Sequence, residues 1–254
     1  MTILQLADVA VGDRLGPVTA RVNAAELIHL AGPNGAGKST LLTRMAGLIE
    51  GDGEILLNGQ PLSQWTSTAL GRHRALLMQQ QTPPFAMPVW HYLQLHQSAD
   101  GADRVMMHLA ARLHLTDKLT RPVNQLSGGE WQRVRLAAVF LQVHPELNPQ
   151  AQILLLDEPM NSLDIAQQAA LDGLIQTFIE AGIAIVMSSH DVNHSLRHAD
   201  QVWLLRGGKL LAQGSSDRVL TPDNLQCAYD IPFRLLAVEG YNVLITDSNV
   251  ENLQ

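Results

Sequence analysis

Cysteine is almost missing from this chain, since Cys227 is the only one among 254 residues. A single thiol allows no disulfide within the chain, and such sparse use of cysteine fits a reducing compartment best. A fold held together by internal disulfides is therefore excluded.

Long apolar runs are missing as well. A membrane-spanning helix needs roughly 18 consecutive apolar residues, and the longest candidate, VRLAAVFLQV, is too short and carries Arg135. The first ten residues, MTILQLADVA, lack the basic start and long apolar region of a secretion signal. We therefore expect that any work at a membrane requires another chain to supply the spanning part.

The chain also has no dense run of Lys and Arg, and its formal net charge is −7. Proteins that bind nucleic acid usually present a basic face, and anionic membrane surfaces attract basic segments too. The charge pattern thus disfavours binding to nucleic acid and to anionic membrane surfaces, and we expect no nucleic-acid partner.

What the chain does have is an alternation of apolar strand patterns with amphipathic helical patterns, which is typical of a largely parallel α/β sheet. From Gln79 to about Pro145 the strand patterns vanish and helical patterns replace them, at 88–97, 103–114 and 130–143. We expect one domain with three parts. These are an α/β core at 1–78 and 146–214, an inserted helical subdomain at 79–145, and a C-terminal extension at 215–254.

The sequence GPNGAGKST at 32–40 fits the phosphate-loop pattern G-x-x-x-x-G-K-[ST] without mismatch. Its glycines let successive backbone N–H groups face an anion. Lys38 would place its ammonium between the β- and γ-phosphates, and Ser39 would offer its hydroxyl to Mg²⁺. The predicted nucleotide-binding residues are Gly32, Pro33, Asn34, Gly35, Ala36, Gly37, Lys38, Ser39 and Thr40.

The stretch ILLLDEP places Asp157 and Glu158 directly after a buried strand. In open parallel sheets, ligands bind beyond the carboxyl ends of the strands. Asp157 would hold Mg²⁺ directly or through water, and Glu158 would act as general base on the attacking water. An isolated pair of acids would instead cap the next helix, but an intact phosphate loop favours the catalytic interpretation.

SSHD ends the neighbouring strand in the same way, so His190 could reach the γ-phosphate or the water. The spacing of His190, His194 and His198 also allows a metal site. We favour the alternative that His194 and His198 are surface residues of a helix that begins after His190.

Gln79 begins the run QQQTPPFAMP, where the core gives way to the helical part. An amide there could contact Mg²⁺ and the water, although a glutamine run before prolines is usually only a polar loop. Gln80 remains an alternative for this role.

Taken together, GPNGAGKST, Gln79, LSGGE, ILLLDE, Asp164 and SSHD occur in the order found in ATP-binding cassette (ABC) transporter ATPases, which the chain resembles over residues 1–215. The resemblance implies a RecA-like phosphate-loop core, with a mainly parallel sheet, antiparallel β elements and an inserted helical subdomain.

The resemblance also implies roles for the remaining motifs. Ser127, Gly128 and Gly129 of the signature LSGGE would contact ATP bound by a partner chain, and Asp164 would lie in the D-loop. The implied assembly is a head-to-tail homodimer on two transmembrane subunits at the cytoplasmic face of the inner membrane. A periplasmic binding protein would act indirectly, through the permease.

Within the family, QQQTPPFAMPVWHYLQLHQ resembles the ATPase subunits of cobalamin (vitamin B12) importers. The ATPases of iron–siderophore or haem importers are the nearest alternative. A non-transport cassette ATPase with a long coiled coil is disfavoured, because too few residues separate Lys38 from Ser127. A regulatory module that does not hydrolyse is disfavoured by Glu158 and His190.

Two features depart from the family. Glu130 stands where glutamine is commoner, and we expect its carboxylate to point away from phosphate or toward the N-terminus of its own helix. No aromatic residue precedes Trp65, although such ATPases usually stack an upstream aromatic residue on adenine. Arg14 or an apolar side chain would have to replace it, and purine selectivity should then be loose.

Overall fold

The computed structural model describes residues 1–79, 81–97 and 101–246. Gln80, the alternative to Gln79, lies outside these residues. The strands form a six-stranded, a four-stranded and a two-stranded sheet.

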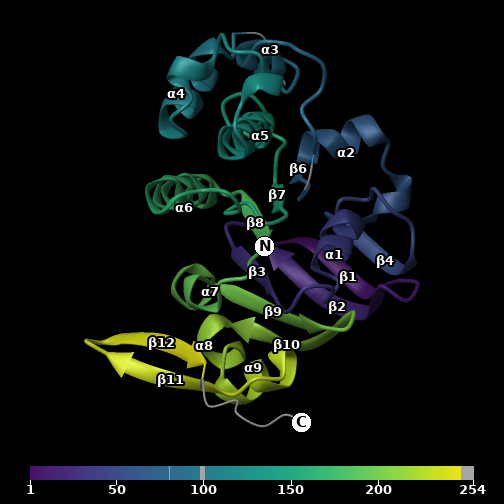
Figure 1. Ribbon diagram of the computed structural model, residues 1–254. Helices are drawn as coiled ribbons and strands as arrows, with labels where there is room; N and C mark the ends of the chain where they lie inside the picture. The colour runs from purple at the N-terminus through teal and green to yellow at the C-terminus, as the bar shows by residue number, and fades with distance from the viewer. Residues whose placement is uncertain (80, 98–100, 247–254) are drawn as a thin grey trace.

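The six-stranded sheet is the centre of the fold (Figure 1). Its order is β10-β9-β3-β8-β7-β6, and all neighbouring pairs are parallel except β9 with β10. The strands are β3 (Leu27–Ala31), β6 (Arg74–Leu77), β7 (Ile153–Leu156), β8 (Ala184–Ser188), β9 (Gln201–Arg206) and β10 (Lys209–Ser215). The predicted α/β fold with a mainly parallel sheet is confirmed.

The four-stranded sheet is antiparallel, in the order β2-β1-β4-β5. Its strands are β1 (Thr2–Val11), β2 (Leu15–Asn23), β4 (Asp52–Leu57) and β5 (Gln60–Pro61). Asn58 and Gly59 both have positive φ and make the turn from β4 to β5, as the dipeptide predicts.

The two faces of the central sheet bury different cores, because successive side chains on a strand point to opposite faces. On β7, Leu154 and Leu156 pack into the core shared with the helical region. Ile153 and Leu155 pack on the other face, with α1 (Lys38–Met45) and the antiparallel sheet. This explains why β7 is buried at every residue and reads as a continuous apolar run.

Helices replace strands between β6 and β7, apart from one isolated bridge between Pro88 and Pro122. The segments are α3 (Val89–Gln94), α4 (Asp103–Arg112), α5 (Gly128–Gln142) and the 3₁₀ turns Thr116–Lys118 and Val123–Gln125. In Figure 1 the three helices gather at one end of the molecule. Leu62–Gln64 (3₁₀) and α2 (Ser67–His73) precede them.

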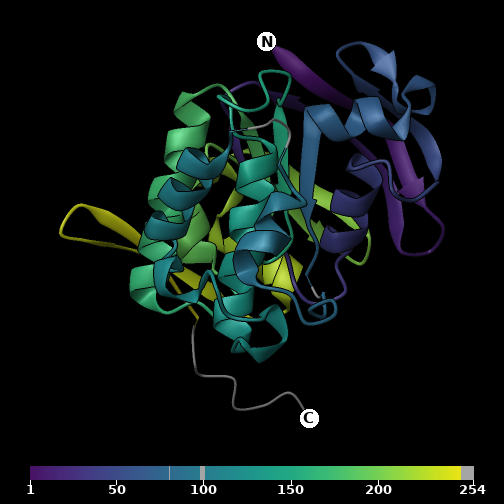
Figure 2. The same cartoon turned by 90° about the horizontal axis from the view of Figure 1, so that it is seen from above.

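The remaining helices flank the sheet: α6 (Ile165–Glu180), α7 (Val192–His198), α8 (Ser216–Val219) and α9 (Pro222–Tyr229). The last two strands, β11 (Phe233–Val238) and β12 (Tyr241–Thr246), form an antiparallel hairpin. It projects from the body in both Figure 1 and Figure 2. Within the part of the chain that the structure describes, no helix is long and apolar enough to cross a bilayer.

Candidate nucleotide site

A cleft of about 1020 Å³ lies at the carboxyl ends of β3, β7 and β8. Residues that follow these strands converge there because parallel neighbours end at the same edge of the sheet. The lining residues are Asp13, Arg14, Asn34, Gly35, Ala36, Gly37, Lys38, Ser39, Thr40, Gln79, Glu158, Asn161, His190, Gly207 and Gly208.

The phosphate loop joins β3 to α1. At Gly32 (φ +140°) a Cβ atom would lie 2.1 Å from the carbonyl oxygen of Leu205, so no larger residue fits. Gly37 (φ +101°) is the N-cap of α1 and offers no side chain to its N–H groups. The start of this helix therefore keeps unsatisfied donors that suit a phosphate.

The Lys38 ammonium points back into the loop. Its Nζ donates to the carbonyl oxygens of Gly32 at 2.6 Å and Pro33 at 3.0 Å. Burial lowers the pKa of Lys38, while the nearby carboxylates of Glu158 and Asp157 raise it in part. Its two hydrogen-bond partners are neutral carbonyl groups, so a bound anion would give the buried Lys38 ammonium an ion pair.

Asp157 is 5% exposed and follows β7 directly. Its Oδ1 accepts a hydrogen bond from Ser188 Oγ at 2.7 Å. The same hydroxyl oxygen accepts the backbone N–H of Glu158 at 2.7 Å. Ser188 therefore fixes both acidic residues relative to β8, a role that the sequence did not indicate.

Glu158 is the most constrained residue of the site. Its backbone has φ +50°, a conformation that is uncommon outside glycine and recurs at functional sites. Its Oε1 lies 2.5 Å from His190 Nε2, and its Oε2 accepts from the side-chain amide of Asn161. Burial raises the pKa of Glu158, but hydrogen bonds from His190, Gln79 and Asn161 lower it further than burial raises it.

The structure therefore brings three of the predicted groups together, since Gln79, Glu158 and His190 share one hydrogen-bonding cluster. Asn161 is an addition that the sequence analysis missed. It lies within LLLDEPMNSLD, three residues after Glu158, and this short spacing could have indicated that its amide contacts the Glu158 carboxylate.

Two loops outside the phosphate motif also line the cleft. Asp13 and Arg14 lie in the exposed turn between β1 and β2, and Gly207 and Gly208 lie in the turn between β9 and β10. The backbone N–H of Gly208 donates to the carbonyl of Ala36 at 3.1 Å, which ties one turn to the phosphate loop. Arg14, which the sequence analysis offered as a replacement for the stacking aromatic residue, thus lines the cleft.

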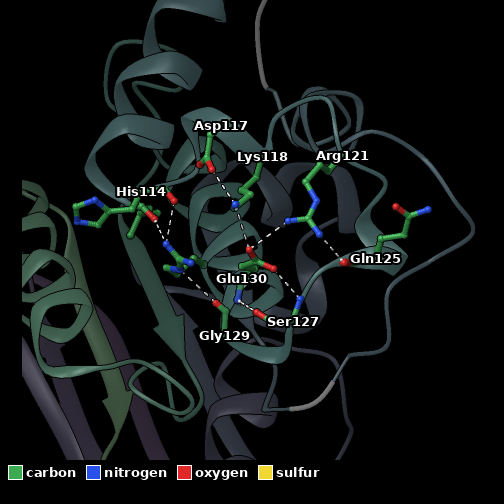
Figure 3. A network of polar contacts seen from close by, with 10 residues as sticks. His114, Asp117, Lys118, Arg121, Gln125, Ser127, Gly129 and Glu130 are labelled. Carbon is green, nitrogen blue, oxygen red and sulfur yellow. Dashed lines mark hydrogen bonds and ion pairs between the residues drawn. The ribbon is translucent and has the colours of Figure 1, made fainter.

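The second glycine-rich stretch begins α5, and its residues do not line the cleft described above. Ser127 is the N-cap, and a capping box joins it to Glu130 (Figure 3). Glu130 Oε2 accepts the N–H of Ser127 at 2.8 Å, while the Ser127 hydroxyl accepts the N–H of Glu130 at 3.3 Å. The prediction that this carboxylate turns toward its own helix N-terminus is confirmed.

Two cations compensate the charge of Glu130. Lys118 Nζ lies 3.5 Å and Arg121 3.4 Å from its Oε1. Hydrogen bonding to the Ser127 N–H lowers the pKa of Glu130, burial raises it, and Arg121 and Lys118 lower it further. Figure 3 shows both cations on the segment before α5, directed at the carboxylate.

Helix α5 is hydrogen-bonded to the segments that follow Gln79 and Glu158. Trp131 Nε1 donates to the carbonyl of Gln81 at 2.7 Å, and Gln132 Nε2 donates to that of Pro159 at 3.2 Å. A Cβ on Gly129 would lie 2.6 Å from the carbonyl oxygen of Ser162. A displacement of α5 must therefore also move the segments around Gln79 and Glu158.

Asp164 does not line the cleft. It is the N-cap of α6, where its Oδ1 accepts the N–H of Gln167 at 2.8 Å. In this chain its side chain is engaged in capping.

The interpretation of the three histidines needs one correction. His190 precedes α7, as predicted, and belongs to the cleft. His198 is exposed, but the His194 side chain is only 12% exposed and lies against Asp172, so it is not a surface residue. The spacing of histidines did not reveal which face of α7 packs against α6.

Comparisons with known proteins agree with this geometry. The family described as ABC transporter matches residues 15–161. The Vitamin B12 import ATP-binding protein BtuD of Escherichia coli O139:H28 (strain E24377A / ETEC) is 60% identical over 244 residues, 96% of this chain and 98% of that protein. BtuD of Escherichia coli O9:H4 (strain HS) matches to the same extent.

Solved structures share the fold. The ATP-binding subunit of an ABC transporter superposes with a TM-score of 0.73 at 27% identity, covering 86% of this chain and 92% of that one. An inward-facing metal-chelate type ABC transporter gives a TM-score of 0.79 at 20% identity, over 98% and 99% of the two chains. The chain belongs to the ABC transporter family and is one of its ATP-hydrolysing subunits.

Proposed function

We propose that this ATPase powers the import of vitamin B12 across a bacterial inner membrane. The observation that carries the proposal is the 60% identity to a vitamin B12 import ATP-binding protein along 96% of this chain. The protein would work as a homodimer docked on the cytoplasmic side of two transmembrane subunits. A periplasmic binding protein would deliver the vitamin to those subunits.

ATP would bind in the cleft with its phosphates on residues 32–40. The loop amides and the α1 N-terminus would surround the β- and γ-phosphates, and Lys38 would exchange its two carbonyl partners for phosphate oxygens. Arg14 would lie over the base, because a guanidinium stacks on aromatic planes.

The residues of the site also fit Mg²⁺. Ser39, Gln79 and Asp157 offer a hydroxyl, an amide oxygen and a carboxylate, which are the hard oxygen ligands that this ion prefers. When bound, Mg²⁺ would neutralise charge on the β- and γ-phosphates. Ser188 would keep the Asp157 carboxylate oriented for that role.

Glu158 would be the general base for hydrolysis. Its lowered pKa keeps it ionised near neutral pH, so it can accept a proton from the attacking water. His190, Gln79 and Asn161 would hold the carboxylate until ATP arrives, and the side chain would then turn from His190 toward the water.

The signature residues would complete the partner's site. Ser127 caps α5, Gly128 and Gly129 begin it, and none of the three lines the chain's own cleft. Glu130 occupies the Ser127 N–H, so the serine hydroxyl and the two glycine amides are the donors for the partner's γ-phosphate. We assign Asp164 to the same dimer contact, through the backbone of the loop that leads into α6, the helix that it caps.

The helical subdomain at 79–145 would contact the membrane subunits, with the α/β core at 1–78 and 146–214 holding ATP and 215–254 as an extension. Exposed apolar side chains support this surface: Phe85 is 77% exposed and Trp90 38%. The hydrogen bond from Trp131 to Gln81 would transmit motion between that surface and the site.

An importer of iron–siderophores or haem is the competing assignment. Co-purification separates the two: the tagged chain is expressed in its own host, and the membrane subunit that binds it is identified with its ligand. Recovery of a permease that retains vitamin B12 supports the proposal. Recovery of a permease that retains a siderophore or haem assigns the chain to the competing class.

A further inference from the structure

Three metal-binding side chains converge outside the ATP cleft, between α6 and α7. They are Asp172 of α6 and His194 and His198 of α7. None of them lines the nucleotide cleft. The ATPase mechanism proposed above assigns no role to these three residues.

The spacing of the three groups is compatible with a metal site. His194 Nε2 lies 3.0 Å and 3.2 Å from the two Asp172 oxygens. Two ligands of a tetrahedral Zn²⁺ at 2.0–2.1 Å are separated by about 3.3 Å, so this pair is already close to the required spacing. One ligand atom from each residue of the trio lies within 4.8 Å of the others.

The two histidines are four residues apart on one helix, which places them on the same face, one turn apart. Their rings stack with centroids 4.5 Å apart. His198 is exposed, while the His194 and Asp172 side chains are 12% and 22% exposed. An ion could therefore enter from the His198 side and meet two ligands that are already held in place.

A histidine metal ligand must be a neutral imidazole, and burial lowers the pKa of two histidines in this region. Burial lowers the pKa of His29 to about 3, with further lowering from His194 and His198. His29 is fully buried, stacks on His194 with centroids 5.5 Å apart, and contacts Ser195 Oγ at 2.9 Å. Burial also lowers the pKa of His198.

We propose that Asp172, His194 and His198 form a binding site for a divalent transition metal ion, with Zn²⁺ as the best fit. Two imidazoles and one carboxylate suit Zn²⁺ and the neighbouring transition metals, whereas Mg²⁺ prefers oxygen ligands alone. The ion would link α6 to α7, the helix that begins two residues after His190. The site does not depend on the proposed transport function.

The test is Zn²⁺ titration into untagged, nucleotide-free, full-length protein after chelator treatment, followed by calorimetry. We expect one Zn²⁺ per chain, and a Co²⁺ complex with the visible absorption of tetrahedral coordination. His198→Ala and Asp172→Asn should each weaken binding by about tenfold or more. His91→Ala, which removes an exposed histidine of α3, is the matched control and should leave it unchanged.

Folding of the variants is checked by their unfolding temperatures without metal, and His198 is exposed, so its removal leaves the core intact. Zn²⁺ should raise the unfolding temperature of the unmodified chain and of His91→Ala only. The proposal is overturned by binding that is equal in His198→Ala and Asp172→Asn, by no measurable binding, or by binding that Ser39→Ala abolishes. The last result would place the ion in the phosphate loop.

Discussion

The Nε2 atom of His190 lies 2.5 Å from Oε1 of Glu158. The two residues follow neighbouring parallel strands, β8 and β7, and are far apart in the sequence. The contact therefore depends on the sheet, and it joins the proposed general base to a histidine of the same cleft. Asn161 and Gln79 complete the cage around the same carboxylate.

Glu158→Gln should still bind ATP but hydrolyse it roughly 100- to 10,000-fold more slowly, because the amide cannot take a proton from water. The variant should accumulate as an ATP-loaded dimer. Phosphate release and size-exclusion chromatography at saturating ATP measure the two effects. Glu54→Gln, an exposed residue on β4, is the control. A Glu158→Gln protein that remains monomeric would refute the shared-site model.

The pH dependence of stability should report on Glu130. Its folded-state pKa is below the ordinary value of 4.5, so the ionised carboxylate stabilises the fold above that pH. This contribution is lost as the pH falls through the folded-state pKa. Glu130→Gln should thus lower the free energy of unfolding by about 0.5–1 kcal/mol at pH 7, because it keeps the cap but loses the ion pairs. Urea unfolding should show this gap closing toward pH 3, and a constant gap would contradict the assignment.

Arg14→Ala should raise the KM for ATP about two- to fivefold and leave kcat nearly unchanged, since a cation–π contact contributes about 0.5–1 kcal/mol. A stack without base-specific hydrogen bonds also predicts comparable hydrolysis of ATP and GTP. Steady-state kinetics with both nucleotides test the two statements. Strong preference for ATP would mean that another group reads the base.

Phe85→Ala should weaken binding to the membrane subunits by about 2 kcal/mol, because an exposed aromatic ring is a typical anchor of an interface. The ATPase activity of the free chain should stay the same. Binding to the detergent-solubilised permease and turnover of the isolated chain are compared. Leu211→Ala, an exposed apolar residue of β10, serves as the control. Equal loss of binding and free-chain activity would exclude a contact role for Phe85.

Much of the site could be predicted because its residues follow local rules. Lys38 belongs to a contiguous motif between a strand and a helix, and Glu158 and His190 both end apolar strands. Parallel pairing alone then brings the strand ends together. The register of β7 with β8 bears this out.

Other features depend on packing that a linear pattern does not contain. The Asn161 side chain donates to Glu158, whose own backbone has φ +50° and turns the chain at that point. His194 is largely buried because α7 packs against Asp172 of α6 and His29 of β3, and no local sequence period indicates this packing. The β2 strand is a different case, because its buried residues Val18, Ala20 and Val22 alternate with exposed ones and the sequence itself contains this pattern.

The most direct test of the account is transport by proteoliposomes that contain this chain, its co-purified membrane subunits and the binding protein. Uptake of labelled vitamin B12 should require ATP. It should be lost with Lys38→Ala, because this substitution removes the ammonium that would hold the phosphates. ATP hydrolysis without accumulation of vitamin B12, or uptake of a siderophore or haem in its place, would contradict the central claim.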